Sequence, residues 1–460
     1  MLEPTEKKPK DDFDWERHVD LDNFIKERVE IFLSNNKFAR GLSDKMLNET
    51  STRFVDWIDH LAVPESEIGE SKLAELGLVE LGNIERPEGF RVFKHPRSYL
   101  FPILLNSGKD TVVGLKPESI DEFLQAMGLG MTPEGKPFSQ IRAAEINRDG
   151  NYVLNAVERR GYDGFVVKKS RDISKYLKAI TDFYCRKRYF KTDDEGMRHT
   201  VKIVSRAVKK LDSARVSDAF FRAERAYWQK RNRAGQVQKA RQDRLGLGWG
   251  NHDHHTYRSS RAHFTDMIRI FEAMGYSCRE KYYAGENAGW GAQILEHKVC
   301  DIVVFTDVDL AQNETSIDFS HEGLADKKEL GTVGLWVGLH GESMLQAGMH
   351  HLEARFIFDK LKSDLEGQGV GVMQPFSYFD FLKQAFTQGD LWKVDTVRLD
   401  RLLKKGSITQ EQYDKFLKEG AIGSHMENLE RDQGFKGFNK ASVTKIISAT
   451  DPRKQNLSGA

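Results

Sequence analysis

Asp253-His254-His255-Thr256 and Met349-His350-His351-Leu352 are two histidine doublets, and each lies at the start of a predicted β-strand. The first strand, 252–258, is followed by a helix over 262–274 and strands over 276–283, 291–297 and 301–308. The second strand, 348–355, is followed by a helix over 358–367, a strand over 379–387, two short helices over 399–404 and 409–418, and a last strand over 422–431. The order β-α-β-β-β therefore occurs twice, which predicts an α+β fold with a duplicated unit.

The two doublets are expected to meet in space. Paired units of this kind can face each other across a curved sheet, where their first strands become neighbours. One inward histidine from each strand would then reach the same point. Glu427, in the last predicted strand, could supply a third ligand from the same face. Two imidazoles and one carboxylate leave about three coordination positions open, the arrangement expected of non-haem Fe(II) oxygenases.

Strand geometry limits the choice of ligand within each doublet. Adjacent side chains point to opposite faces of a sheet, so only one histidine of each doublet can bind the metal. From the residues alone, the choice between His254 and His255, and between His350 and His351, stays open. A structural zinc site is not favoured, because it would close at four ligands and usually draw on cysteine. The three cysteines lie far apart in the chain and away from the starts of these strands.

Several segments resemble the 4-hydroxyphenylpyruvate dioxygenases. Residues 347–356 (AGMHHLEARF) resemble the second-ligand segment of that family, and Asp253-His254 its first. Residues 382–387 (LKQAFT) resemble the strand with a substrate-contacting glutamine. Residues 426–431 (MENLER) and 433–439 (QGFKGFN) resemble the final ligand strand and the turn after it. The order of these segments is also the same, and the resemblance covers roughly 249–450.

The resemblance implies the vicinal-oxygen-chelate (glyoxalase/dioxygenase) fold of repeated βαβββ units, bound Fe(II), and oxidative decarboxylation and hydroxylation of a 2-oxo acid by O₂. The 2-oxoadipate dioxygenase/decarboxylase family is also similar and uses an aliphatic 2-oxo diacid. A ring-cleaving extradiol dioxygenase with the same ligand set is the alternative. The resemblance assigns His254, His351 and Glu427 as metal ligands, Gln384 as a substrate contact, and Phe435, Phe438 and Asn439 as further residues of the catalytic pocket.

The segment 168–244 differs from the rest in charge. It holds 23 Lys and Arg against 9 Asp and Glu, whereas the whole chain has a net charge of +1. Apolar residues at helical spacing predict two or three amphipathic helices. A working role in binding nucleic acid or a protein partner is the alternative from another functional class. A helical subdomain that covers the enzyme is favoured, because the chain as a whole is not basic.

The sequence thus predicts an N-terminal helical extension (1–50), a degenerate N-terminal copy of the fold without metal (51–167), the basic helical insert (168–248), the metal-binding domain (249–450) and a tail (451–460). No run of about 18 apolar residues occurs, so no membrane span is expected. The start of the chain resembles neither a signal nor a transit peptide. A cytoplasmic enzyme is therefore expected, with a small-molecule substrate and O₂ as partners. Homo-oligomer formation stays open.

Overall fold

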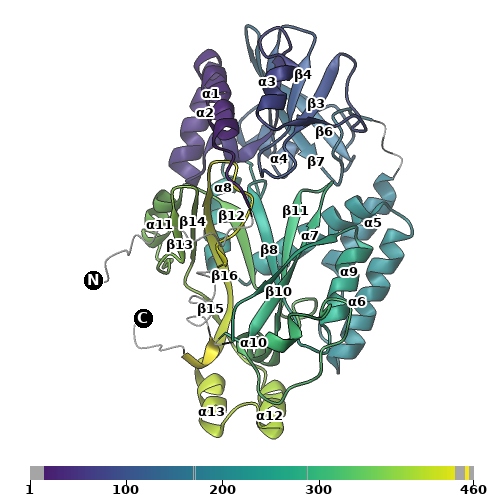
Figure 1. Ribbon diagram of the computed structural model, residues 1–460, viewed down its shortest axis with the longest axis vertical. Coiled ribbons are helices and arrows are strands. Elements are labelled where there is room, and N and C mark those ends of the chain that lie inside the picture. Colours follow the sequence, from purple (N-terminus) through teal and green to yellow (C-terminus); the bar gives the residue numbers. More distant parts are fainter. Residues whose placement is uncertain (1–14, 169, 171, 287, 441–450, 455–460) are drawn as a thin grey trace.

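A computed structural model describes residues 15–168, 170, 172–286, 288–440 and 451–454 of the chain (Figure 1). The architecture is mixed α+β with two β-sheets, one above the other in this view. Residues 441–450 of the predicted metal-binding domain and most of the predicted tail lie outside the described residues. None of the described helices combines the length and the apolar character that are needed to cross a bilayer.

The C-terminal sheet contains the two predicted units. The first is β8 (His252–Arg258), α9 (Phe264–Ala273), β9 (Ser277–Tyr283), β10 (Trp290–His297) and β11 (Ile302–Asp309). The second is β12 (His351–Arg355), α11 (Phe358–Glu366), β13 (Ser377–Phe379), β14 (Leu382–Phe386) and β16 (Ala421–Arg431). The strand order is β13-β14-β16-β12-β8-β11-β10-β9. The first strands of the two units, β8 and β12, pair antiparallel at the centre, which confirms the predicted duplication.

Two details of this half differ from the prediction. The predicted strand over 379–387 is a hairpin, because the chain turns between Phe379 and Leu382; its two strands, β13 and β14, complete the second unit. Helix α10 (Thr332–His340) was not predicted, and it is buried on nearly every side. The two predicted short helices are confirmed as α12 (Thr396–Lys405) and α13 (Gln410–Glu419), and a short strand, β15 (Asp390–Trp392), pairs with β16.

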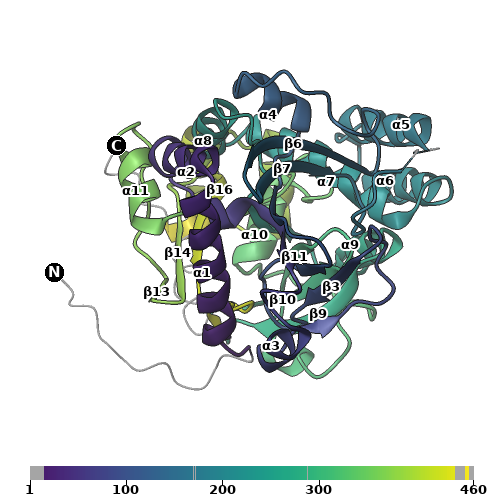
Figure 2. The same cartoon turned by 90° about the horizontal axis from the view of Figure 1, so that it is seen from above.

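The N-terminal sheet repeats the same arrangement with one strand fewer. Its strand order is β2-β3-β4-β1-β5-β7-β6, with β1 parallel to β4, β5 parallel to β7, and β1 antiparallel to β5. Its elements are β1 (Ile58–Pro64), α3 (Glu70–Glu75), β2 (Val79–Glu80), β3 (Phe90–Lys94), β4 (Ile103–Asn106), β5 (Thr111–Leu115), α4 (Ile120–Ala126), β6 (Ile141–Asp149) and β7 (Tyr152–Arg159). Helices α1 (Val19–Asn35) and α2 (Lys37–Lys45) lie beside this sheet in both views (Figures 1 and 2).

The strand pairing also shows what the N-terminal sheet lacks. Asp59-His60 on β1 corresponds in sequence to Asp253-His254 on β8. Val112 lies opposite Ala62 on the neighbouring strand, whereas His351 lies opposite Thr256 in the C-terminal sheet. Among the residues that the structure describes, no group of three or more metal-ligating side chains occurs in this N-terminal sheet.

The basic segment forms four helices rather than the predicted two or three. They are α5 (Ile173–Tyr184), α6 (Asp193–Val208), α7 (Ser213–Gln229) and α8 (Arg233–Asp243). Several of the basic side chains are buried and paired within the protein. Arg186 and Arg188 both contact the fully buried carboxylate of Glu224, at 2.9 and 2.6 Å. Two of the three basic residues in the segment 186–190 (RKRYF) therefore belong to an internal ion-pair network.

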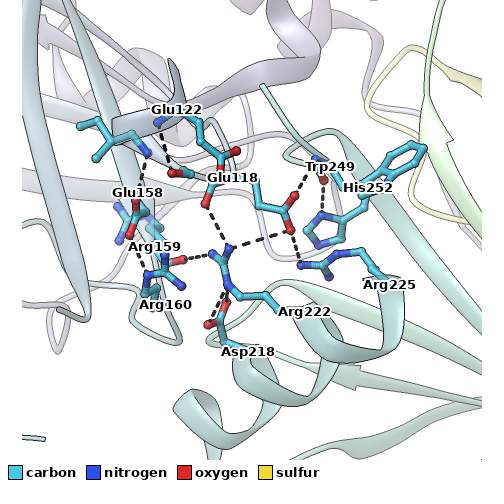
Figure 3. A network of polar contacts seen from close by, with 12 residues as sticks. Glu118, Glu122, Glu158, Arg159, Arg160, Asp218, Arg222, Arg225, Trp249 and His252 are labelled. Atoms are coloured by element: carbon cyan, nitrogen blue, oxygen red, sulfur yellow. Dashed lines mark hydrogen bonds and ion pairs between the residues drawn. The ribbon is translucent and has the colours of Figure 1, made fainter. Parts of the chain in front are cut away.

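Helix α7 links the two sheets through a second polar network (Figure 3). Arg222 donates hydrogen bonds to Asp218 and to the backbone carbonyls of Glu118 and Arg159, all at 3.1–3.3 Å. Arg225 donates to the Glu118 carboxylate at 3.1 Å. The other oxygen of this carboxylate accepts from the backbone N–H of Trp249 at 2.9 Å. The network therefore fixes the start of the C-terminal unit against the N-terminal sheet.

Candidate metal centre

Three side chains meet on the face of the C-terminal sheet at its centre. His351 Nε2 lies 3.2 Å from Glu427 Oε2, and His254 Nε2 lies 3.9 Å from the same oxygen. The three ligand atoms all lie within 4.8 Å of one another, and the three residues are buried. Two ligands about 2.1 Å from one ion and at right angles lie about 3 Å apart, so the spacing suits one shared metal ion.

Strand register explains why these residues meet. His351 on β12 pairs with His425 on β16, and Glu353 pairs with Glu427. On its other side β12 pairs with β8, where Glu353 lies opposite His254. Because side chains alternate between faces, His254, His351 and Glu427 all lie on the same side of three adjacent strands.

The second histidine of each doublet lies on the opposite face. His255 is fully buried, packs against Phe221 with ring centroids 4.5 Å apart, and has Arg225 at 3.4 Å. His350 Nδ1 donates to the carbonyl of Gly423 at 3.1 Å. In the structure, His254 and His351 are therefore the doublet members that face Glu427.

The electrostatics of the three residues suit a cation. Burial lowers the pKa of His254, and it lowers that of His351 to about 3, so both rings are neutral bases near pH 7. Burial also raises the pKa of Glu427 to about 7. A buried carboxylate is costly without a positive partner, and a divalent ion would supply one. The residues present thus fit a divalent metal ion.

A second buried carboxylate, Glu353, lies beside the three residues. Glu353 is fully buried, and its Oε2 is in direct contact with His254 Nδ1. Gln384 Nε2 donates to both Glu353 Oε1 at 3.0 Å and Glu427 Oε1 at 3.1 Å. Contacts of this kind orient a ligand histidine and hold a ligand carboxylate in place. Gln384 therefore bridges two carboxylates, and its buried Oε1 has no hydrogen-bond partner among the described residues.

Arg431 and Asp253 flank the centre at the end toward the N-terminal sheet. Arg431 contacts both oxygens of Asp253 at 3.1–3.2 Å and donates to the carbonyl of Phe435. Asp253 Oδ2 lies 3.4 Å from His254 Nδ1. Pairing with Arg431 keeps the pKa of Asp253 well below its usual range despite burial. Asp253 is therefore a permanent anion next to a candidate ligand.

A buried arginine lies at the other end of the same row of side chains. Arg258 follows His254 and Thr256 on one face of β8, and Thr256 lies opposite His351. Its side chain is almost completely buried, with its Nε 3.6 Å from Asp307 Oδ2. The Nε and Nη1 of Arg258 have no hydrogen-bond partner among the described residues. Burial raises the pKa of Asp307 to about 7, even with this arginine nearby.

The three predicted pocket residues after β16, Phe435, Phe438 and Asn439, do not lie together. Phe438 packs against Phe305 with centroids 5.0 Å apart, and the Phe305 ring lies 4.5 Å from the ring of His254. Phe435 packs in a separate apolar cluster, with Phe381 at 5.0 Å. Asn439 Nδ2 lies 3.4 Å from Ser377 Oγ, and Ser377 pairs with Gln384 across the hairpin. Phe438 is thus connected to the ring of His254 through Phe305, and both Phe438 and His254 line the same small hollow.

The sequence also contained a signal for Glu353, which the prediction did not include. Glu353 follows His351 by two positions, so it lies on the same face of the strand. A second cluster, Glu272, Cys278 and His321, also brings metal-ligating atoms within 4.8 Å. That cluster is on the surface, and His321 is already bonded to Asp318 and Glu272, at 2.7 and 2.9 Å.

Comparisons with known proteins give remote structural similarity. No protein-family model and no curated protein matches the chain. A putative hydrolase from Shewanella frigidimarina is 15% identical, covers 46% of this chain and 92% of its own, and has a TM-score of 0.32. A mutant 4-hydroxymandelate synthase from Streptomyces coelicolor is 10% identical over 88% of this chain and 100% of its own, with a TM-score of 0.28. Methylmalonyl-CoA epimerase from Mycobacterium tuberculosis is 12% identical over 40% and 88%, with a TM-score of 0.23.

These identities and TM-scores are too low to transfer an activity. The fold is identified by the paired units, in which the strand order places the two first strands side by side at the centre of one sheet. The chain has the vicinal-oxygen-chelate fold.

Proposed function

We propose that this protein is a non-haem Fe(II)-dependent dioxygenase that acts on a 2-oxo acid. One observation carries the proposal: two neutral imidazoles and one carboxylate, all buried, converge from three adjacent strands. This ligand set leaves coordination positions open on one side of the ion. When bound, Fe(II) would let the substrate and O₂ bind side by side and would activate O₂.

The protein's own residues would hold the ligands and exclude water. Glu353 contacts His254 Nδ1, which leaves Nε2 of that ring to face the metal position. Gln384 fixes the Glu427 carboxylate from its other oxygen. Phe305 packs beside His254 and Phe386 packs beside His351, with ring centroids 4.5 and 5.0 Å apart. This apolar wall limits the access of bulk water to the reacting atoms.

Arg258 supports an acidic substrate. It is buried on the same strand face as His254, and two of its nitrogens have no hydrogen-bond partner among the described residues. Unsatisfied buried guanidinium donors are costly unless an anion occupies them. A carboxylate of the substrate would satisfy them, which favours an oxo acid with a second acid group over a catechol. The oxo and carboxylate oxygens at the other end of such a molecule would face the metal.

Oxygen uptake tests the proposal. The purified protein, loaded with Fe(II) without oxygen, would be offered a panel of aromatic and aliphatic 2-oxo acids and catechols. We expect O₂ uptake with at least one 2-oxo acid and release of one CO₂ per O₂. For a diacid substrate, Arg258→Met should raise KM at least tenfold. Uptake with catechols and without CO₂ would contradict the proposal, and so would no uptake with any compound.

A further inference from the structure

A cavity of about 160 Å³ lies between the two sheets, and residues of the polar network in Figure 3 form part of its wall. Its walls come from both halves of the protein. The N-terminal half contributes Asp59, Lys116 and Arg159, and the C-terminal half contributes His252, Asp301 and Arg355, with helix α7 on one side. Most of these six side chains are charged, and apolar and aromatic side chains line the rest of the cavity. A cavity lined by both halves can only form when the two sheets are docked on each other.

Two cations in the walls of the cavity are less closely paired with carboxylates than the others. The ammonium group of Lys116 has no hydrogen-bond or ion-pair partner among the described residues, although the side chain is largely enclosed. Arg355 forms only a long ion pair with Asp253, with its Nε 3.8 Å from Oδ1, and this buried Nε has no hydrogen-bond partner among the described residues. The other enclosed cations are paired: Arg159 with Asp59, Arg222 with Asp218, Arg225 with Glu118, and Lys94 with Asp301.

Lys116 and Arg355 are close enough to repel each other. Burial lowers the pKa of the Lys116 ammonium, and Arg355 lowers it further. Burial raises the pKa of Asp301, but Lys94, Lys116, Lys436 and Arg355 together lower it to about 2, so this one carboxylate is ionised and is shared among four cations. The backbone of Asp301 has a φ of 54°, in the left-handed region that is uncommon for residues other than glycine. Lys116 thus carries a buried positive charge that no carboxylate contacts directly among the described residues.

This cavity continues toward the metal centre. A smaller hollow of about 50 Å³ is lined by His254, Phe305 and Phe438, which lie at the centre. Five residues line both hollows, and these include Lys116 and Arg355. Arg355 follows Glu353 by two positions on β12 and so lies on the same face, about 7 Å farther along the strand. The two cations therefore stand where the cavity meets the metal site.

We infer that Lys116 and Arg355 form an anion-binding vestibule between the two sheets, which captures a carboxylate of the substrate and leads it to the metal centre. The identity of this anion as the substrate rests on the proposed function. The vestibule itself requires only an organic carboxylate. Two cations in a partly enclosed, low-dielectric cavity attract such an anion more strongly than exposed lysines would.

Calorimetry with the metal-free protein and glutarate as the probe tests the vestibule directly. We expect one glutarate to bind per chain, and Lys116→Met and Arg355→Met each to weaken the binding at least tenfold. Lys116→Arg should retain it. Lys109→Met removes an exposed lysine outside both hollows and should bind glutarate like the wild type. Because Lys116 is unpaired, Lys116→Met should keep or raise the Tm, which excludes unfolding as the cause of weaker binding.

Two further variants separate this inference from the proposed function. His351→Ala removes a candidate metal ligand and should bind glutarate as the wild type does. Glutarate affinities of Lys116→Met and Arg355→Met within twofold of the wild type would overturn the vestibule. So would a loss of glutarate binding in Arg258→Met that neither of these two variants shows. If no 2-oxo acid is turned over but glutarate binding still depends on both cations, the proposed function fails and the anion site stands.

Discussion

Glu353 shows how a single buried residue can set the chemistry of its neighbours. It contacts His254 Nδ1 and accepts a hydrogen bond from Gln384, which also holds Glu427. Two of the three candidate ligands are thus connected through this one carboxyl group. An acceptor at Nδ1 fixes the tautomer of the imidazole, so that Nε2 carries the free lone pair toward the metal.

Replacing Glu353 should therefore weaken metal binding without removing a ligand. We expect Glu353→Leu to lower the affinity for Fe(II) by about 10- to 100-fold, the range usual for residues that orient metal ligands. Glu353→Gln keeps an acceptor oxygen and should recover much of the loss. The measurement is anaerobic Fe(II) binding of the wild type and both variants. Equal affinities in wild type and Glu353→Leu would show that this residue does not orient His254.

Helix α7 illustrates how an element can be basic in composition and structural in role. Its Arg222 contacts Asp218 on the same helix and the backbone carbonyls of Glu118 and Arg159 (Figure 3), and so connects the helix to the N-terminal half. The sequence predicted only a basic helical subdomain that covers the enzyme. The pairing could not be predicted from the sequence, because Glu118 and Arg225 lie far apart in the chain and meet only after both sheets form.

Removing Arg222 should destabilise the protein. Arg222→Met leaves Asp218 without its ion-pair partner and two backbone carbonyls without donors, and we expect a loss of about 3 kcal/mol in the free energy of unfolding. Arg206→Met is the control, because Arg206 is exposed on α6. Urea unfolding of the two variants measures the difference. Equal unfolding midpoints would show that the network contributes little.

Helix α10 carries a buried histidine that should make stability depend on pH. Burial lowers the pKa of His340 to about 3, and its Nε2 donates to the carbonyl of Ile422 at 3.0 Å. The ring is neutral in the folded state but takes up a proton in the unfolded state below about pH 6.5. Its contribution is therefore complete above pH 6.5 and is lost as the pH falls toward 3.

The comparison of wild type with His340→Gln isolates this effect. Between pH 6.5 and 5 the wild type should lose about 2 kcal/mol more stability than the variant. Chemical unfolding at several pH values gives both curves. Parallel curves over this interval would mean that His340 titrates alike in the folded and unfolded states.

At the scale of the whole molecule, the periodic elements were the part that sequence could predict. The strand and helix order of the C-terminal units followed from residue alternation and helical spacing. Helix α10 was missed because its residues are buried on nearly every side, so no polar face marks the helical period. The hairpin of β13 and β14 was predicted as one strand, because only two residues separate them.

The candidate site was only partly accessible from sequence. Duplicated units implied that the two first strands meet, and the pairing of β8 with β12 confirms this. The register of β16 against β12, which brings Glu427 beside Glu353, depends on pairings between distant segments. For the same reason the cavity between the two sheets could not be foreseen, since Lys116 and Arg355 belong to different sheets.

Anaerobic Fe(II) binding by equilibrium dialysis is the most direct test of the metal centre. We expect one Fe(II) per chain for the wild type and loss of that binding in His254→Ala, His351→Ala and Glu427→Gln. Glu430→Gln is the matched control, because Glu430 lies on the same strand as Glu427 but faces the other way and holds the N-terminus of α11 through Phe358 N at 2.6 Å. Full Fe(II) binding by the His351→Ala and Glu427→Gln variants would contradict the account.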